Sequence, residues 1–111
     1  VEIFRNIKTI RFDFLAEVYK NRSIYEWYVS QLVYRYVLMP SGEVTIQDRG
    51  NPSGQISTTM DNNMINVWLQ AFEYYSWSEC DSLVYGDDRV SSWPSIPCDY
   101  VDNVIQMYKD I

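Results

Sequence analysis

Residues 83–90 read LVYGDDRV, in which two short segments of strand-forming composition flank a glycine and two acids. Residues 83–85 and 89–93 have the length and composition of strands, and residues 86–88 are typical of the tight turn between two antiparallel strands. The pattern predicts a β-hairpin that holds two adjacent carboxylates at its tip.

A helical pattern precedes this hairpin and another follows it. Residues 57–77 show helical spacing of apolar side chains, among them Met64, Trp68, Tyr75 and Trp77, which we expect in the core rather than on a base-stacking surface. After Pro94 and Pro97 end the hairpin, Asp99 is expected to cap a last helix. The inner side of that helix is predicted to consist of Val101, Val104, Ile105 and Tyr108.

Two more helices and a second hairpin are predicted in the first half of the chain. Over residues 2–19 one apolar stripe contains Ile3, Ile7, Ile10, Phe14 and Val18. A capping box of Ser23 and Glu26 predicts a second helix that runs to about Tyr34, and its buried side is predicted to contain Tyr25, Tyr28, Val29 and Leu32. Residues 35–39 and 43–47 predict two strands joined by a Pro-Ser-Gly turn.

The order of these elements predicts an α+β fold with antiparallel hairpins packed on helices. The 111 residues are 47% hydrophobic and 16% aromatic, which is enough apolar material for one core. No apolar run approaches the ~20 residues that span a bilayer. Because the chain begins with Val1, we expect it to be a piece of a longer protein.

The charge of the chain is unevenly distributed. The net charge is −6, with +1 on residues 1–49 and −7 on residues 50–111. An acidic segment is a poor electrostatic match for a polyanion, which argues against nucleic-acid binding. The alternative is that the acids hold divalent cations while basic contacts to phosphate lie elsewhere, and composition leaves both interpretations open.

The absence of histidine excludes several kinds of catalytic site within this chain. There is no CxxC pair, and the two cysteines, Cys80 and Cys98, are far apart in the sequence. These facts argue against a zinc site, a Cys–His pair and a Ser–His–Asp triad. We interpret the cysteines as reduced, structural thiols of an intracellular protein.

The paired acids Asp87 and Asp88 are the first candidate for chemistry. Two like charges side by side repel each other unless a cation neutralises them. Mg²⁺ suits this position because it prefers oxygen ligands and often uses one or two carboxylates together with substrate phosphates. An exposed acidic turn without any ligand is the alternative, since Asp is a favoured turn residue.

The second candidate is the loop and helix start in residues 50–62, GNPSGQISTTMDN. Ser53 and Gly54 lie in a loop that leads into a helix start rich in hydroxyl groups. Thr58 and Asn62 are four residues apart and therefore share one helix face. Such a loop at a helix N-terminus suits contacts to phosphate or ribose, and a simple helix cap with additional Ser and Thr is the alternative.

The two candidates together resemble motifs B and C of viral RNA-dependent RNA polymerases. The spacing Ser53-Gly54-x3-Thr58-x3-Asn62 is followed about 25 residues later by Tyr85-Gly86-Asp87-Asp88. Residues 50–74 and the segment YVLMPSGEVT (residues 36–45) also resemble the astrovirus polymerases, most clearly between Tyr36 and Asp88.

This resemblance implies a fold and a reaction. It implies a partial palm of a right-hand polymerase: residues 1–111 would be a single incomplete segment, with residues 1–49 at the junction of fingers and palm and residues 50–111 in the palm. The implied reaction is RNA-directed nucleotidyl transfer that replicates a viral genome with two Mg²⁺ ions, or alternatively Mn²⁺.

The resemblance also implies roles for single residues. Asp87 would be a metal ligand and Asp88 a weaker or outer partner, both of them catalytic. Ser53 and Gly54 would form the flexible loop beside the template and the incoming nucleotide. Thr58 and Asn62 would recognise the ribose, with Asn62 sensing the 2′-hydroxyl.

Some family features are expected to lie outside the chain. Motif A, with the first metal-binding Asp, is expected just before Val1, and the motif D lysine after Ile111. Asp13 is expected to be solvated or salt-bridged and Lys109 to be a surface lysine. Arg89 is expected either to contact RNA backbone or to pair with Asp88.

The resemblance further implies partners and a location. The partners would be template and nascent RNA, nucleoside triphosphates, the remaining polymerase chain (motif A, fingers and thumb) and other viral replication proteins. The location would be the host cytoplasm, at membrane-associated replication complexes. Without the missing parts, the segment alone is expected to be inactive.

Two alternatives stay open. A reverse-transcriptase-like polymerase shares a Tyr-x-Asp-Asp turn, although Asn62 and the Ser53-Gly54 loop argue against it. The second alternative is a non-catalytic RNA-binding or assembly module with a decayed active site. The intact pair Asp87 and Asp88 argues against it.

Overall fold

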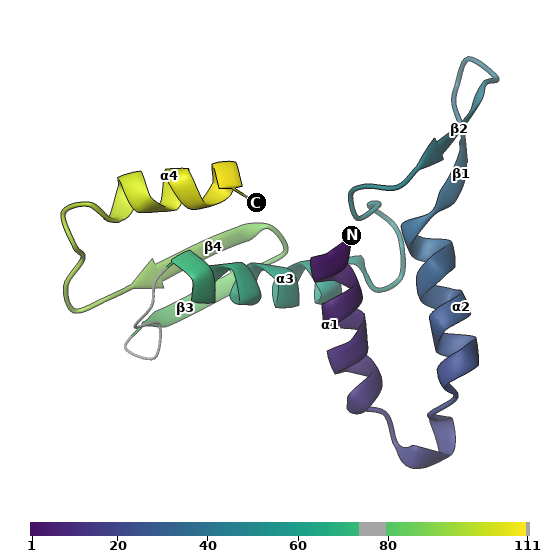
Figure 1. The fold of residues 1–111 in the computed structure, drawn as a ribbon, viewed down its shortest axis with the longest axis horizontal. Coiled ribbons are helices and arrows are strands. Elements are labelled where there is room, and N and C mark those ends of the chain that lie inside the picture. Colours follow the sequence, from purple (N-terminus) through teal and green to yellow (C-terminus); the bar gives the residue numbers. More distant parts are fainter. Residues whose placement is uncertain (74–79, 111) are drawn as a thin grey trace. The chain divides into compact units, whose positions relative to one another are not determined.

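A computed structural model describes residues 1–73 and 80–110, and these residues confirm the predicted α+β class (Figure 1). The chain divides into two compact units, Val1–Gln55 and Ile56–Ile111. The first unit contains α1 (Glu2–Asp13), the 3-10 helix η1 (Glu17–Tyr19), α2 (Arg22–Val33), β1 (Arg35–Leu38) and β2 (Val44–Gln47). The second contains α3 (Thr58–Glu73), β3 (Asp81–Tyr85), β4 (Asp88–Ser92) and α4 (Tyr100–Asp110). The expected assignment of residues 1–49 and 50–111 to polymerase subdomains stays a prediction.

The first helix is shorter than predicted. α1 ends at Asp13, which is exposed, and Phe14 and Val18 are 82% and 81% exposed instead of lying on a buried stripe. The amide of Leu15 donates to the carbonyl of Phe12, a bond over three residues that tightens the end of the helix. The residues after α1 reverse the chain so that α2 can return along α1, and they are therefore unavailable to a longer helix.

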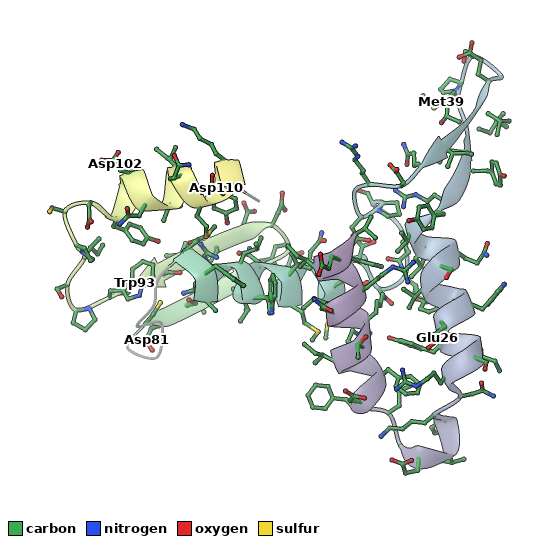
Figure 2. The ribbon with its side chains drawn as sticks, in the orientation of Figure 1. Glu26, Met39, Asp81, Trp93, Asp102 and Asp110 are labelled. Atoms are coloured by element: carbon green, nitrogen blue, oxygen red, sulfur yellow. The ribbon has the colours of Figure 1, made fainter. Side chains whose placement is uncertain are left out.

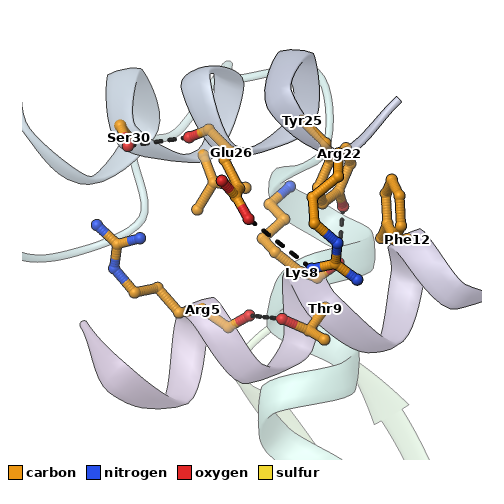
Figure 3. Close-up of a pocket in the computed structure, with 9 residues that line it drawn as sticks. Arg5, Lys8, Thr9, Phe12, Arg22, Tyr25, Glu26 and Ser30 are labelled. Atoms are coloured by element: carbon orange, nitrogen blue, oxygen red, sulfur yellow. Dashed lines mark hydrogen bonds and ion pairs between the residues drawn. The ribbon is translucent and has the colours of Figure 1, made fainter. Parts of the chain in front are cut away.

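α1 and α2 contact each other through the aromatic rings of Phe12 and Tyr25, which lie beside several charged and polar side chains (Figure 3). Val29 of α2 is buried as predicted, whereas Tyr25 is only half-buried. The ring of Tyr25 lies 4.9 Å from that of Phe12, and its hydroxyl donates to the carbonyl of Lys8 at 2.8 Å. An open pocket of about 370 Å³ lies between the two helices, with Arg5 and Arg22 among its lining residues, and it contains none of the predicted site residues.

The predicted capping box at the start of α2 is wrong. The cap is Asn21, whose side-chain oxygen accepts from the amide of Ile24 at 3.1 Å. Asn21 has extended backbone angles and α2 starts directly after it, so Ser23 already lies inside the helix. Glu26 lies 3.8 Å from the guanidinium of Arg22 instead of reaching back to an amide.

The strands and the turn of the first hairpin agree with the prediction, but its expected packing on helices does not, because Tyr36, Leu38, Val44 and Ile46 are all exposed. β1 and β2 are antiparallel, with Leu38 opposite Val44. The amide of Met39, labelled near the hairpin tip in Figure 2, donates to the carbonyl of Glu43 and closes the loop. No residue of β2 is buried within the described part of the chain.

In the second unit, α3 contacts both the β3–β4 hairpin and α4. α3 begins one residue later than predicted, and the rest of the predicted helix, with Tyr75 and Trp77, falls outside the described residues. Trp68 and Met64 are half-buried rather than fully enclosed, and the ring of Trp68 lies 4.6 Å from that of Phe72.

The last helix presents a different side than predicted. Asp99 precedes α4 as expected, and its carbonyl accepts from the amide of Asn103. Val101 and Ile105 are exposed, while Val104 and Met107 are half-buried. α4 is oriented by its tyrosines rather than by the apolar stripe. The ring of Tyr100 lies 5.4 Å from that of Trp93, and the hydroxyls of Tyr100 and Tyr108 donate to Glu73 of α3.

None of the described helices is both long enough and apolar enough to pass through a membrane.

Candidate functional site

A stripe of polar side chains on α3 faces the β3–β4 hairpin. Its members are spaced by three, four and three residues and therefore lie along one helix face. We call this set the polar stripe: Asn63, Asn66, Gln70 and Glu73. Each member forms a hydrogen bond or ion pair with a residue of the hairpin or its flank. The helix thus holds the hairpin by directional contacts rather than by apolar packing alone.

The first two members of the stripe bind the backbone of the acidic turn. The side-chain oxygen of Asn63 accepts from the amide of Gly86. The side-chain nitrogen of Asn66 donates to the carbonyls of Gly86 and Asp88, each at 3.3 Å. These three contacts bracket Asp87 on both sides.

The turn itself has two residues, Gly86 and Asp87, with Tyr85 opposite Asp88 as the closing strand pair. Gly86 has φ of 62°, and no other residue of the turn has a positive φ. This combination is typical of a type II′ turn, which places glycine first. The hairpin is confirmed, and Asp88 proves to belong to the strand β4 rather than to the turn.

Asp87 and Asp88 both lie exposed at the hairpin tip. Carboxylate oxygens are the ligands that Mg²⁺ prefers, and a Mg²⁺ site often has only one or two carboxylates plus substrate phosphates. No group of three or more acidic, Cys or His side chains converges on a common point within residues 1–73 and 80–110. The chemistry of these two carboxylates fits a Mg²⁺ ion of which they would be two of the ligands.

Arg89 follows the two acids but faces away from them, and the expected pairing with Asp88 is wrong. One guanidinium nitrogen donates to the carbonyl and the side-chain oxygen of Asn66 at 3.1 and 3.0 Å. The other forms an ion pair with Glu73, and the two side chains are only 15% and 4% exposed. Neighbouring strand residues point to opposite faces, which explains why Arg89 reaches α3 while Asp88 does not.

Glu73 is the centre of this ion pair and its hydrogen bonds. Burial alone would raise the pKa of Glu73, but hydrogen bonds from Arg89 and Tyr108 outweigh burial and lower the pKa below its ordinary value. The hydroxyl of Tyr108 donates to Glu73 at 2.6 Å, and burial together with this bond raises the pKa of Tyr108 to about 12. The hydrogen bond to Glu73 also raises the pKa of Arg89. All three groups keep their ordinary charge states near neutral pH.

Gln70 secures the far end of the hairpin. Its amide group exchanges hydrogen bonds with the hydroxyl of Ser82 at 2.6 and 2.8 Å. The same hydroxyl lies 3.1 Å from that of Ser91 across the strand pair. The hairpin is thus fixed to α3 at its tip, its middle and its base.

The predicted ribose-binding residues lie on α3, before and beside the polar stripe. Thr58 is the first residue of the helix, and Thr58 and Asn62 are both half-buried. Asn62 directly precedes Asn63, so the two side chains are separated by about 100° around the helix axis. The second unit therefore brings the ribose candidates and the acidic turn onto one helix and its attached hairpin.

The predicted loop residues Ser53 and Gly54 belong to the first unit. Both are exposed, and the amide of Gln55 donates to the carbonyl of Pro52 across them. Gly54 has a φ of 85°, a backbone conformation that residues other than glycine adopt only with strain. The glycine is thus required by the turn itself.

Asn63 and Asn66 are functional candidates that the sequence interpretation missed. The signal was present, because residues 63, 66, 70 and 73 are all amides or acids at helical spacing. The same helix also has an apolar period, and a search for apolar spacing does not reveal the polar one.

Comparison with known proteins shows the family of the chain. A model of the family described as viral RNA-dependent RNA polymerase matches residues 1–111, and the chain belongs to that family. The chain is 56% identical to the non-structural polyprotein 1AB of Mink astrovirus 1 and 56% identical to that of Human astrovirus-1. It is 43% identical to the polyprotein of Turkey astrovirus 2.

These matches cover nearly the whole chain but little of each relative. They include 99%, 98% and 98% of the chain, and 9%, 8% and 8% of the respective polyproteins. No solved structure matches the chain.

Proposed function

We propose that the intact protein is an RNA-directed RNA polymerase that replicates a viral genome, and that this chain forms part of its palm. The observation that supports this most is the exposed pair Asp87 and Asp88 on a turn that α3 holds at Gly86 and Asp88. A reaction centre for phosphate transfer needs acids that are accessible and also fixed in position.

In this proposal Asp87 and Asp88 hold Mg²⁺, or Mn²⁺ in its place, with Asp87 as the principal ligand. When bound, a pair of such ions supplies charge neutralisation at the attacking and leaving oxygens of nucleotidyl transfer. Thr58 and Asn62 bind the ribose, with Asn62 at the 2′-hydroxyl. Ser53 and Gly54 contact the template and the incoming nucleotide.

The remaining ligands come from elsewhere. Motif A, the fingers and the thumb are supplied by the rest of the polymerase chain, and the substrates are RNA and nucleoside triphosphates. We further propose that the enzyme acts with other viral replication proteins in the host cytoplasm at membrane-associated complexes.

The central experiment compares two acids of one hairpin in the intact polymerase. Asp87→Asn should reduce nucleotide incorporation on a primed RNA template by a factor of at least ~10³, because losing several kcal/mol of metal binding costs tenfold for every ~1.4 kcal/mol. Asp81→Asn, an exposed acid at the other end of β3, is the matched control and should retain activity. Full activity of Asp87→Asn would instead show that this hairpin does not hold the catalytic acids, and would support the alternative in which this segment is a non-catalytic RNA-binding module.

A second experiment tests the ribose assignment. Asn62→Ala in the intact polymerase should lower the preference for ribonucleotides over deoxynucleotides, because the amide that senses the 2′-hydroxyl is removed. The measurement is the ratio of kcat/KM values for the two substrates. An unchanged ratio contradicts the assignment and removes one argument against a reverse-transcriptase-like enzyme.

A further inference from the structure

Two members of the polar stripe, Asn63 and Asn66, form hydrogen bonds with backbone atoms on both sides of Asp87. Asn63 accepts from the amide of Gly86, and Asn66 donates to the carbonyls of Gly86 and Asp88. No side-chain atom of Asp87 or Asp88 takes part in these bonds. The two asparagines therefore act on the position of the turn while both carboxylates stay accessible.

The orientation of the Asn66 amide is determined by Arg89. A guanidinium has only donors, so the Asn66 atom that faces it must be the side-chain oxygen. The side-chain nitrogen consequently points to the two carbonyls of the turn. Glu73 in turn holds Arg89 through a buried ion pair.

We propose that Asn63 and Asn66 are positioning residues for the metal-binding acids, with Arg89 and Glu73 fixing the Asn66 amide. This inference rests on the proposed function, because it assigns a role toward the metal ligands named there. If the proposal is right, the two asparagines hold the turn through chemically different hydrogen bonds. Asn63 acts only as an acceptor toward the turn, whereas Asn66 acts as an acceptor toward Arg89 and as a donor toward the turn.

This difference gives a test in which one substitution is made at two positions of one helix. Asn63→Asp keeps an acceptor for the Gly86 amide. Asn66→Asp keeps the acceptor for Arg89 but replaces the donor by an oxygen that faces two carbonyls. Both changes add the same charge and nearly the same volume, so a general effect of charge or folding would act on both alike.

The first measurement is hydrogen exchange of the β3–β4 hairpin in the intact polymerase. Asn66→Asp should speed exchange in the turn by on the order of tenfold, and Asn63→Asp should leave it within about twofold of the wild type. Asn63→Leu removes the acceptor and should speed exchange at Gly86 by a similar tenfold factor. Val67→Ala, at an exposed position on the same helix, is the control that should change nothing.

The second measurement is direct binding of Mn²⁺, followed by electron paramagnetic resonance, together with steady-state kinetics. Changes in groups that orient metal ligands typically cost 10–100-fold in metal affinity or activity. Asn66→Asp should therefore weaken Mn²⁺ binding and reduce kcat by about tenfold, with the KM for nucleotides within about twofold. Asn63→Asp should keep both values near those of the wild type.

Equal effects of Asn63→Asp and Asn66→Asp on exchange and on Mn²⁺ binding would overturn the positioning role. Wild-type behaviour of Asn66→Asp in both measurements would overturn it as well. Failure of the proposed function has a different signature, namely undiminished synthesis by Asp87→Asn, and it leaves the hydrogen-exchange comparison unaffected.

Discussion

Removal of the Arg89 guanidinium should loosen the attachment of the hairpin to α3. In Arg89→Leu, Asn66 loses the two hydrogen bonds that one guanidinium nitrogen donates, and the buried carboxylate of Glu73 loses its ionic partner. Breaking a buried pair on one side typically costs 3–5 kcal/mol. We expect the lower end, about 3 kcal/mol, because Arg89 is slightly exposed and Glu73 keeps its bond from Tyr108.

The assay is native-state hydrogen exchange of the β3–β4 hairpin in the intact polymerase, which reports the free energy of local opening. A loss of about 3 kcal/mol corresponds to roughly a hundredfold faster exchange. The exchange of α1 and α2 serves as an internal control and should not change.

A double substitution separates the ion pair from general loss of packing. Arg89→Leu combined with Glu73→Leu removes both charges together, so the double variant should be more stable than the sum of the single effects by about 1–3 kcal/mol. Strictly additive effects, or less than tenfold faster exchange in Arg89→Leu, would refute the proposed importance of this pair.

Further predictions concern pH, a turn glycine and a helix cap. Because the folded-state pKa of Glu73 is lowered, its stabilising effect should be complete above about pH 4.5 and be lost as the pH falls below that value; Glu73→Gln should abolish this dependence in thermal unfolding of the intact polymerase. Because the pKa of Tyr108 is raised to about 12, stability should fall as the pH rises from 10 to 12, and Tyr108→Phe should show a smaller fall. Gly86→Ala should cost ~1–2 kcal/mol of hairpin stability through its positive φ alone, since a Cβ there would meet no atom within 4 Å; hydrogen exchange equal to the wild type would contradict this. Asn21→Ala should cost about 1 kcal/mol at the start of α2, seen as faster exchange of its first turn, whereas Ser23→Ala should have little effect.

Both hairpins could be predicted from the sequence because their turns are determined locally. The Pro-Ser-Gly turn and the Gly86-Asp87 turn each contain residues whose backbone preferences select a chain reversal. The α+β class followed from these turns and from the helical periodicities between them. The candidate acids were found for the same reason, since Asp87 lies in the second turn and Asp88 directly follows it.

Partners that lie far apart in the sequence could not be predicted in this way. For Arg89 the sequence left contact with RNA backbone and pairing with Asp88 as alternatives. The structure excludes the pairing with Asp88: Arg89 binds Glu73, sixteen residues earlier, because the pleat of β4 turns it toward α3. The end of α1 was misjudged because an apolar spacing continues through Phe14 and Val18, although the return of α2 ends the helix before them. Both cases concern tertiary geometry that overrides a local pattern.

The attachment of the hairpin to α3 limits how the acidic turn can move. Two apolar surfaces can slide over each other by a fraction of an ångström at little cost, but hydrogen bonds lose strength steeply when their geometry is distorted. We therefore expect α3 and the turn to move as one rigid unit with a single preferred relative orientation. If this segment acts as proposed, adjustments of distance to a substrate would have to come from the substrate or from other parts of the polymerase.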